Sequence, residues 1–393
     1  MNQLLHTPEG VRDIYNEEFK KRQYLEKMML EKIHSYGYEN IQTPTFEFFD
    51  IFGKEIGTNP SKDLYKFFDR EGNTLVLRPD FTPSVARAAA KYFSKDLTSV
   101  RLSYSGNVFL NNSNYQGRLK ETTQLGAELI GDDTLDADSE IISMACECLL
   151  SVGLEDFKIS VGHSSIFRGL VEAANFSEEE VDELKELILN KNFFGVDEFL
   201  GNMDIDDELR SLFSILRQFY SSPSDWVDVK EKALNYPKVY DAFNYFEKLY
   251  ELLEVYGVSD YVSFEVGLIS PFQYYTGVIF SGYTYGSGEP IVKGGRYDKL
   301  LSNFGKDAPA IGFAVLVDQL QLAVDRQKVA IPIEKNRDIL LYTKENRQLA
   351  IAKAKTYRDY GKVVQLIRIP SMDQVDTFKE IYKDYYVELI EVK

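Results

Sequence analysis

The stretch that most restricts the fold of this chain is a pair of strand-like runs joined by a polar loop, within residues 101–131. The first run ends in GNVF, the loop reads NNSNYQGRLK, and the second run reads TTQLGAELIG, which predicts two antiparallel strands. Residues two apart share one face of a strand, so Gln124, Gly126 and Glu128 lie on one side, opposite Leu125 and its apolar neighbours. The hairpin therefore combines an apolar face with a face that carries an amide, a glycine and a carboxylate.

That polar face has two interpretations. It is either an exposed edge of the sheet or a buried surface that binds a ligand. The apolar flanks and Gly126 favour burial, and a glycine between two polar side chains leaves space for a ligand on the strand. A buried Glu128 carboxylate would then need N–H groups or a positive charge as partners.

The whole chain predicts an α+β fold with more than one domain, since 393 residues exceed the usual size of one core. Helix patterns at 17–36 and 139–151, together with the strand-like runs, favour an antiparallel sheet with flanking helices. A helical insertion is predicted at about 164–256. A linker near residue 335 precedes a small β-α-β-α-β domain over 336–393.

Two further segments carry specific predictions. Residues 310–327, AIGFAVLVDQLQLAVDRQ, have the pattern of a helix that begins after Pro309. Residues 274–285, YYTGVIFSGYTY, are predicted to form a strand. Tyr274 and Tyr275 would then point to opposite faces, so one tyrosine would lie in the core and the other would line a pocket.

Asp80 and the glycine pair at 294–295 are the other informative positions. Asp80, in LRPDFT, follows a strand and precedes a helix, so it is either the helix N-cap or a ligand-binding carboxylate. The glycines end a predicted strand in KGGRYDKLL, which indicates a turn or a close approach of the backbone. Neither G-x-x-x-x-G-K-[ST] nor G-x-G-x-x-G occurs in the sequence, so no phosphate-binding glycine loop is predicted.

Composition narrows the classes of function. No apolar run is long enough to cross a membrane and no signal layout begins the chain, so we expect a cytoplasmic protein without membrane contact. The net charge is −17 and no dense basic run occurs, which argues against nucleic acid binding and favours small ligands or protein partners. Cys146 and Cys148 lie two apart on a predicted helix and cannot form a disulfide, and with three histidines in the chain we expect no metal site.

Several collinear motifs resemble the histidyl-tRNA synthetase family of class II synthetases. They are TPEGVRDI, GYENIQTPTFE, TLVLRPDFT, GNVF with GRLKETTQLGAELIG, YYTGVIF, GGRYDKLL and PAIGFAVLVDQL. They extend from about residue 7 to 325, which covers most of the chain. The resemblance implies a class II synthetase-like domain over 1–325, with an antiparallel sheet, flanking helices and the helical insertion.

The main departures from that family affect the ATP site. The family has Phe-Arg-x-Glu where this chain has FLNN at 109–112, so Leu110 replaces an arginine. Gln319 replaces the arginine that would hold the γ-phosphate, and Ser270 replaces the catalytic arginine of an Arg-Gly-Leu-Asp-Tyr-Tyr run. Thr122 stands where an aromatic residue would stack on adenine. Adenylate formation depends on preorganised positive charge around the phosphoryl group, so the resemblance implies that this chain does not activate an amino acid.

The amino-acid half of the site is retained in the resemblance. Asp80, Thr82 and Gln124 match residues that hold the α-amino group of histidine, with Asp80 one methylene shorter than the usual glutamate. Glu128 and Tyr275 match the pair that reads the imidazole. These residues imply a site specific for histidine, because an analogue without the imidazole would leave the carboxylate unpaired.

The remaining candidates complete this predicted histidine site. Tyr274 is included beside its neighbour. The partner of the histidine carboxylate is left open by the motifs, since the family's arginines are absent. Arg118 is the first candidate, and Arg296 of GGRYD is a weaker one that could be structural.

A synthetase-like fold that keeps a histidine site and loses activation resembles the regulatory subunits of ATP phosphoribosyltransferase. This resemblance implies a non-catalytic subunit, without cofactor, that the short-form catalytic subunit needs and through which histidine inhibits. It also implies self-association as a dimer and a hetero-octamer with the catalytic subunit. The alternatives are a divergent histidyl-tRNA synthetase, a histidine sensor for another partner, and a scaffold whose pocket binds nothing.

Overall fold

The computed structural model describes residues 5–53, 60–93, 99–111, 118–270, 274–333, 338–383 and 388–391. The chain divides into two compact units, Met1–Ile331 and Pro332–Lys393. The sequence prediction places the end of the first domain at 325 and the start of the second at 336. The two units are described separately below.

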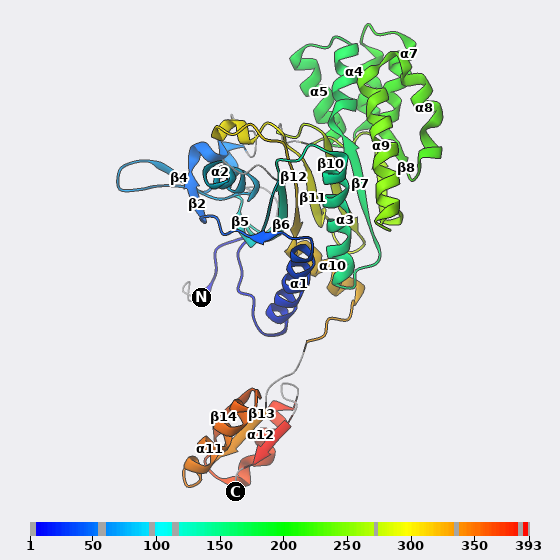
Figure 1. Ribbon diagram of the computed structural model, residues 1–393. Coiled ribbons are helices and arrows are strands. Elements are labelled where there is room, and N and C mark those ends of the chain that lie inside the picture. Colours follow the sequence, from blue (N-terminus) through cyan, green and yellow to red (C-terminus); the bar gives the residue numbers. More distant parts are fainter. Residues whose placement is uncertain are drawn as a thin grey trace. The chain divides into compact units, whose positions relative to one another are not determined.

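A mixed sheet forms the centre of the first unit (Figure 1). Among the described residues its strands are, in spatial order, β1 (Glu39–Asn40), β5 (Val100–Phe109), β6 (Glu121–Ile130), β12 (Ala310–Leu316), β11 (Val292–Arg296), β10 (Val278–Thr284), β7 (Phe157–His163), β9 (Val262–Glu265) and β8 (Phe219–Tyr220). Antiparallel pairing, as predicted, joins the strands from β5 to β7. The outer pairs β1–β5 and β7–β9 are parallel, because long crossover segments connect their strands.

The predicted helix over 310–327 is wrong in its first half. Residues Ala310–Leu316 form strand β12, and helix α10 spans Val317–Gln327. Strand β12 pairs with β6 on one side and β11 on the other, so it is an inner strand of the sheet. A short apolar run in an inner strand has the same pattern as a buried helix segment, and periodicity alone does not distinguish the two.

The strand predicted from residue 274 begins later, at Val278. Tyr274 and Tyr275 precede strand β10, so the expectation that they point to opposite faces of a strand is wrong. The backbone N–H of Thr276 donates to the carbonyl of Arg296 at 2.8 Å, and the Thr276 hydroxyl donates to Asp298 at 2.9 Å. These bonds hold the segment with the two tyrosines against the end of β11.

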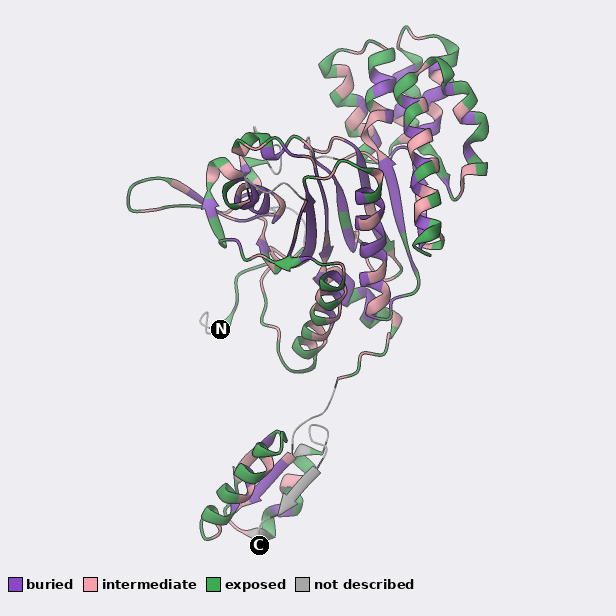
Figure 2. Ribbon diagram, in the orientation of Figure 1, coloured by how far each residue is buried: buried purple, intermediate pink, exposed green. Residues whose placement is uncertain are grey.

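The apolar face of β6 packs in the main core, as the sequence predicts. Leu125, Ala127 and Leu129 are all 0% exposed and share one cluster with residues of two helices. These helices are α1 (Asn16–Ser35), which contributes Leu25, and α3 (Leu135–Ser151), which contributes Ile141. Figure 2 shows the central strands as buried.

A second small sheet and helix α2 complete the central part of the first unit. The small sheet contains β2 (Phe46–Phe48), β4 (Thr74–Leu77) and β3 (Lys66–Phe68), in that order. Helix α2 (Thr82–Tyr92) follows β4 with Pro83 in its first turn, as predicted, because proline needs no N–H bond there.

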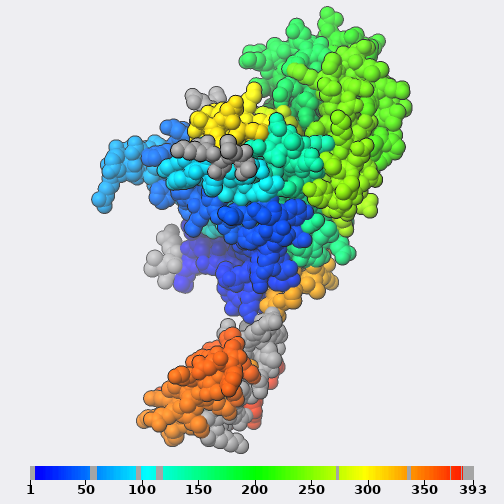
Figure 3. All heavy atoms as spheres, viewed as in Figure 1, coloured from blue at the N-terminus to red at the C-terminus, as the bar shows by residue number. Residues whose placement is uncertain are grey.

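Helices occupy the stretch predicted as an insertion, and they belong to the first unit. They are α4 (Ser164–Ala173), α5 (Glu178–Leu189), α6 (Phe193–Gly201), α7 (Asp207–Phe213), α8 (Val227–Lys232) and α9 (Pro237–Val255). The predicted capping box between Ser177 and Glu180 is present at the start of α5. In Figure 3 these residues, coloured green to yellow-green, form one lobe of the first unit.

The second unit has the predicted β-α-β-α-β order. Its elements are β13 (Asp338–Tyr342), α11 (Arg347–Asp359), β14 (Val364–Arg368), α12 (Val375–Tyr382) and β15 (Glu388–Glu391). The strands form a parallel sheet in the order β14-β13-β15. Parallel neighbours require crossover connections, which the two helices supply.

Two sequence expectations about the whole chain can be compared with the described residues. No helix among them is long and apolar enough to cross a membrane. Cys146 and Cys148 are buried free thiols on α3, and burial raises the pKa of both. No cluster of metal-ligating side chains occurs in the part of the chain that the structure describes.

Candidate functional site

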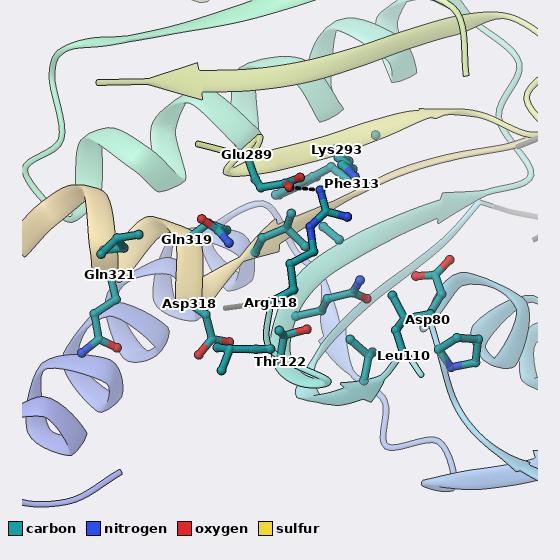
Figure 4. A pocket seen from close by; sticks show the side chains of 18 of the residues that line it. Asp80, Leu110, Arg118, Thr122, Glu289, Lys293, Phe313, Asp318, Gln319 and Gln321 are labelled. Atoms are coloured by element: carbon teal, nitrogen blue, oxygen red, sulfur yellow. Dashed lines mark hydrogen bonds and ion pairs between the residues drawn. The ribbon is translucent and has the colours of Figure 1, made fainter. Parts of the chain in front are cut away.

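A cavity of about 760 Å³ opens on the polar face of the central sheet (Figure 4). Small residues form its floor, because Glu128 of β6 pairs with Gly312 of β12, which pairs in turn with Gly295 of β11. One pleat along, Gly126 pairs with Ala314. The side chains of Glu128 and Tyr275 lie over this floor, because a β-carbon at Gly312 would be 1.6 Å from the Glu128 Oε2 atom and one at Gly295 would be 2.7 Å from the Tyr275 ring.

Gln124 lies on this face and lines the cavity. Its Oε1 atom is buried, and it has no hydrogen-bond partner among the described residues. Buried acceptors in folded proteins are almost always paired, so an unpaired one at a cavity wall is a position for a ligand N–H.

Gly126 does not leave the space that the sequence interpretation assigned to a ligand. A β-carbon at this position would lie 2.1 Å from the Phe313 carbonyl oxygen and 2.7 Å from the Tyr104 hydroxyl oxygen. The space is therefore filled by the neighbouring strand and by a tyrosine ring. Glycine is needed here for close packing within the protein.

Glu128 is buried, which excludes the exposed-edge interpretation for this residue. Its carboxylate is 1% exposed and accepts hydrogen bonds from Thr82 at 2.9 Å, Tyr104 at 3.3 Å and Tyr297 at 2.5 Å. Burial raises the pKa of Glu128 to about 8, although these hydroxyl donors oppose the shift. Thr82 and Tyr297 line the cavity, so Glu128 lies directly behind the cavity wall.

Asp80 lies one residue before the N-cap of α2, so the expectation that it is the helix N-cap is wrong. Its Oδ1 accepts the backbone N–H of Phe81, the N-cap residue, at 2.8 Å. Asp80 also lines the cavity. Burial raises its pKa, and the positive charge of Lys293 acts in the opposite direction.

Tyr274 and Tyr275 both line the cavity. Their ring centroids are 4.6 Å apart, and the Tyr274 ring also contacts Tyr297 edge-on at 6.1 Å. Burial raises the pKa of both tyrosines, so they are neutral hydroxyl groups that can donate or accept. Six of the seven predicted histidine-site residues line this cavity, namely the two tyrosines, Asp80, Thr82, Gln124 and Arg118.

The two arginines considered for the histidine carboxylate have different surroundings. Arg118 lines the cavity and pairs with Glu289 at 2.5 Å. Arg296 is buried and pairs with Asp138 at 2.6 Å and Asp298 at 3.1 Å. Arg296 is not among the described residues that line the cavity, so its role is structural, as the sequence interpretation allowed.

Residues of the altered ATP motifs line the same cavity. Leu110, Thr122 and Gln319 all line it, and Gln319 accepts the Ser287 hydroxyl at 3.1 Å. Ser270 lies instead in the lining of a neighbouring cavity of about 300 Å³. Asn112 of the FLNN run lies outside the described residues.

Formal charges on the cavity lining cancel. Among the described lining residues, the basic ones are Arg12, Arg118, Lys120, Lys293 and Arg326, and the acidic ones are Glu18, Asp80, Glu289, Asp318 and Asp325. Some of these are paired with one another, as Arg12 is with Glu18 at 2.5 Å. A triphosphate would therefore meet no excess of positive charge here, in contrast to the usual requirement for binding and transferring phosphoryl groups.

Sequence reasoning missed Lys293, Tyr104 and Tyr297. It treated the glycine pair at 294–295 as the end of a strand, whereas β11 runs through both glycines to Arg296. Once the strand is extended, Lys293 and Tyr297 fall on the same face as Gly295, toward the cavity. The spacing in KGGRY was the signal that could have identified Lys293 and Tyr297.

Comparison with known proteins places the chain in a family. The sequence matches the family profile described as Histidyl-tRNA synthetase over residues 10–320. An ATP phosphoribosyltransferase regulatory subunit from Acetivibrio thermocellus is 38% identical over 362 residues, which cover 92% of this chain and 86% of the relative. Another, from Caldanaerobacter subterraneus subsp. tengcongensis, is 34% identical over 380 residues, 96% of this chain and 99% of the relative. This chain belongs to the family of ATP phosphoribosyltransferase regulatory subunits.

Solved structures agree with this family. One described as an ATP phosphoribosyltransferase regulatory subunit/histidyl-tRNA synthetase, from Bacillus halodurans C, superposes with a TM-score of 0.85 at 33% identity and covers 99% of this chain and 98% of that one. The histidyl-tRNA synthetase of Nostoc sp. PCC 7120 has a TM-score of 0.79 at 18% identity, over 97% of this chain and 89% of that one. The predicted class II synthetase-like fold of this regulatory-subunit family member is therefore confirmed.

Proposed function

We propose that this chain is a non-catalytic subunit that activates a short-form ATP phosphoribosyltransferase catalytic subunit and lets histidine inhibit it. The complex would join ATP to phosphoribosyl pyrophosphate in the first step of histidine biosynthesis. The observation that carries the proposal is the composition of one cavity lining. It offers polar groups suited to an amino acid, and among the described residues it has no excess of the cations that ATP activation needs.

The polar side chains at the cavity support histidine as the ligand. Asp80 supplies a carboxylate for an ammonium group, and the unpaired Oε1 of Gln124 supplies a second acceptor nearby. Tyr275 supplies a hydroxyl for the imidazole, and Glu128 stands behind the wall with hydroxyl donors that an imidazole N–H could replace. Such charge-assisted bonds are stronger than neutral ones and discriminate against ligands that cannot make them.

The residues of the altered ATP motifs support the absence of synthetase activity. Leu110 and Gln319 line the cavity where the synthetase family has phosphate-binding arginines. Loss of a single preorganised donor typically lowers a rate by roughly 10²–10³. Loss of several from one site is therefore expected to leave no useful amino-acid activation.

Inhibition requires that histidine bind the inhibited assembly more tightly than the active one. Linkage of this kind typically amounts to about 1–3 kcal/mol between two sites. A ligand with equal affinity for both states would not change the activity, however tightly it bound. The assembly we propose is a hetero-octamer built on dimers of this chain.

A divergent histidyl-tRNA synthetase is the second candidate, and the family-profile match over residues 10–320 favours it. Histidine-dependent exchange between ATP and pyrophosphate separates the two functions. We expect no exchange above background with this chain, whereas clear exchange would refute the proposal.

Reconstitution tests the proposal itself. The chain is added to a short-form catalytic subunit and formation of phosphoribosyl-ATP is followed. We expect strong stimulation by this chain and its reversal by added histidine. A lack of stimulation would refute the regulatory role and would favour a histidine sensor for another partner or a scaffold.

A further inference from the structure

A site for an amino acid needs a group that holds its carboxylate as well as one that holds its ammonium. An α-amino acid carries its ammonium and its carboxylate on the same carbon. Whatever binds the carboxylate must therefore lie close to Asp80, which faces the ammonium. The candidates are cations that line the cavity with Asp80 and take part in no ion pair within the described residues.

Lys293 meets both conditions. It lies on β11 opposite Ala314, on the small-residue floor, and lines the cavity with Asp80. Its positive charge acts on the Asp80 carboxylate, and in Figure 4 the two side chains lie away from the end marked by Asp318 and Gln321. Lys293 is exposed, so its ammonium is accessible to a ligand from solution.

Lys293 and Asp80 do not form an ion pair with each other. Within the described residues neither takes part in an ion pair within 4.0 Å, although each lies in the other's field. Two opposite charges separated in this way across an open cavity match a zwitterionic head group, whose ammonium and carboxylate would fit between them.

The two arginines considered from the sequence are less suited to this role. Arg118 is paired with Glu289, a residue of the segment between β10 and β11. Arg296 is held by Asp138 and Asp298 behind the sheet. If either arginine moved to bind a ligand, its ion pair within the protein would break. Lys293 has no ion pair in the described part of the chain, so binding a ligand would break none.

We propose that Lys293 is the residue that binds the α-carboxylate of the amino-acid ligand, in place of the arginines absent at Leu110 and Ser270. This inference rests on the proposed function, since it takes the cavity to be the histidine site. Lys293 would then be the residue through which the protein binds the amino acid more tightly than analogues without a carboxylate.

Calorimetric titration of the full chain with histidine and with histidinol, which replaces the carboxylate by a hydroxymethyl group, tests this role. The wild type should bind histidine about 10- to 100-fold more tightly than histidinol, the range expected for a charge-assisted bond. In Lys293→Met that ratio should fall close to one, through weaker histidine binding and unchanged histidinol binding. Lys293→Arg should keep most of the ratio, and Arg118→Met should keep it fully.

Three results would overturn the inference. Lys293→Met could bind histidine as the wild type does, it could lose both ligands by the same factor, or Arg118→Met could be the variant that loses the ratio. Failure of the wild type to bind histidine at all would be a different result, because it would refute the proposed histidine site and this inference with it. Thermal unfolding of each variant checks that the fold is intact.

Discussion

The buried Glu128 carboxyl gives the protein a pH dependence that one substitution should remove. Its pKa is raised from 4.5 to about 8 in the folded chain, so between these values the folded state holds a proton that the unfolded state has lost. Stability from this group is therefore fully present below about pH 4.5 and is lost as the pH rises toward 8. One unit of pKa corresponds to about 1.36 kcal/mol, so the total loss is about 5 kcal/mol.

Glu128→Gln cannot titrate and keeps an acceptor for the surrounding hydroxyls. The difference in free energy of unfolding between Glu128→Gln and the wild type should grow by about 3 kcal/mol between pH 5.5 and 7.5 in favour of the variant. Urea unfolding without ligand, followed across this pH range, measures the difference. The contributions of the other acidic residues to the pH dependence are the same in both proteins and cancel. Parallel pH profiles for the two proteins would refute the reasoning.

Two further predictions concern packing and buried charge. Asp138→Ala should lower the free energy of unfolding by about 3–5 kcal/mol, because it leaves Arg296 as a buried charge without its closest partner. Asp133 is exposed, so Asp133→Ala should have little effect. Equal effects of the two substitutions in urea unfolding would contradict this reasoning. Gly126→Ala should lower stability by about 1–3 kcal/mol or more, since its β-carbon would overlap the neighbouring strand. Gly201→Ala is the matched control, because nothing lies within 4 Å of its β-carbon position, and similar melting temperatures for these two glycine variants would show the reasoning to be wrong.

Features that depend on local chemistry could be predicted from the sequence. The hairpin of β5 and β6, the apolar face through Leu125, and the capping box of α5 all follow from residue spacing over a few positions. The fold class followed from collinear motifs, and similarity to known structures confirms it.

Features that depend on pairing between distant strands could not be predicted in the same way. Strand β12 was mistaken for a helix because its apolar run is flanked by strands that lie far away in sequence. The environment of Gly126 depends on Tyr104 and on the β12 backbone, and neither adjoins it in the chain. Lys293 became a candidate only when the register of β11 placed it over the cavity floor.

The central claim is that this cavity holds the histidine that inhibits the catalytic subunit. It is tested most directly by the histidine concentration that halves phosphoribosyl-ATP formation in the reconstituted complex, for the wild type and for Asp80→Asn. The rates of each complex are expressed relative to its own rate without histidine. Loss of a charge-assisted bond to the ammonium should then raise the half-inhibiting concentration at least about 10-fold in the variant. An unchanged inhibition curve for Asp80→Asn would place the inhibitory site elsewhere and contradict the account.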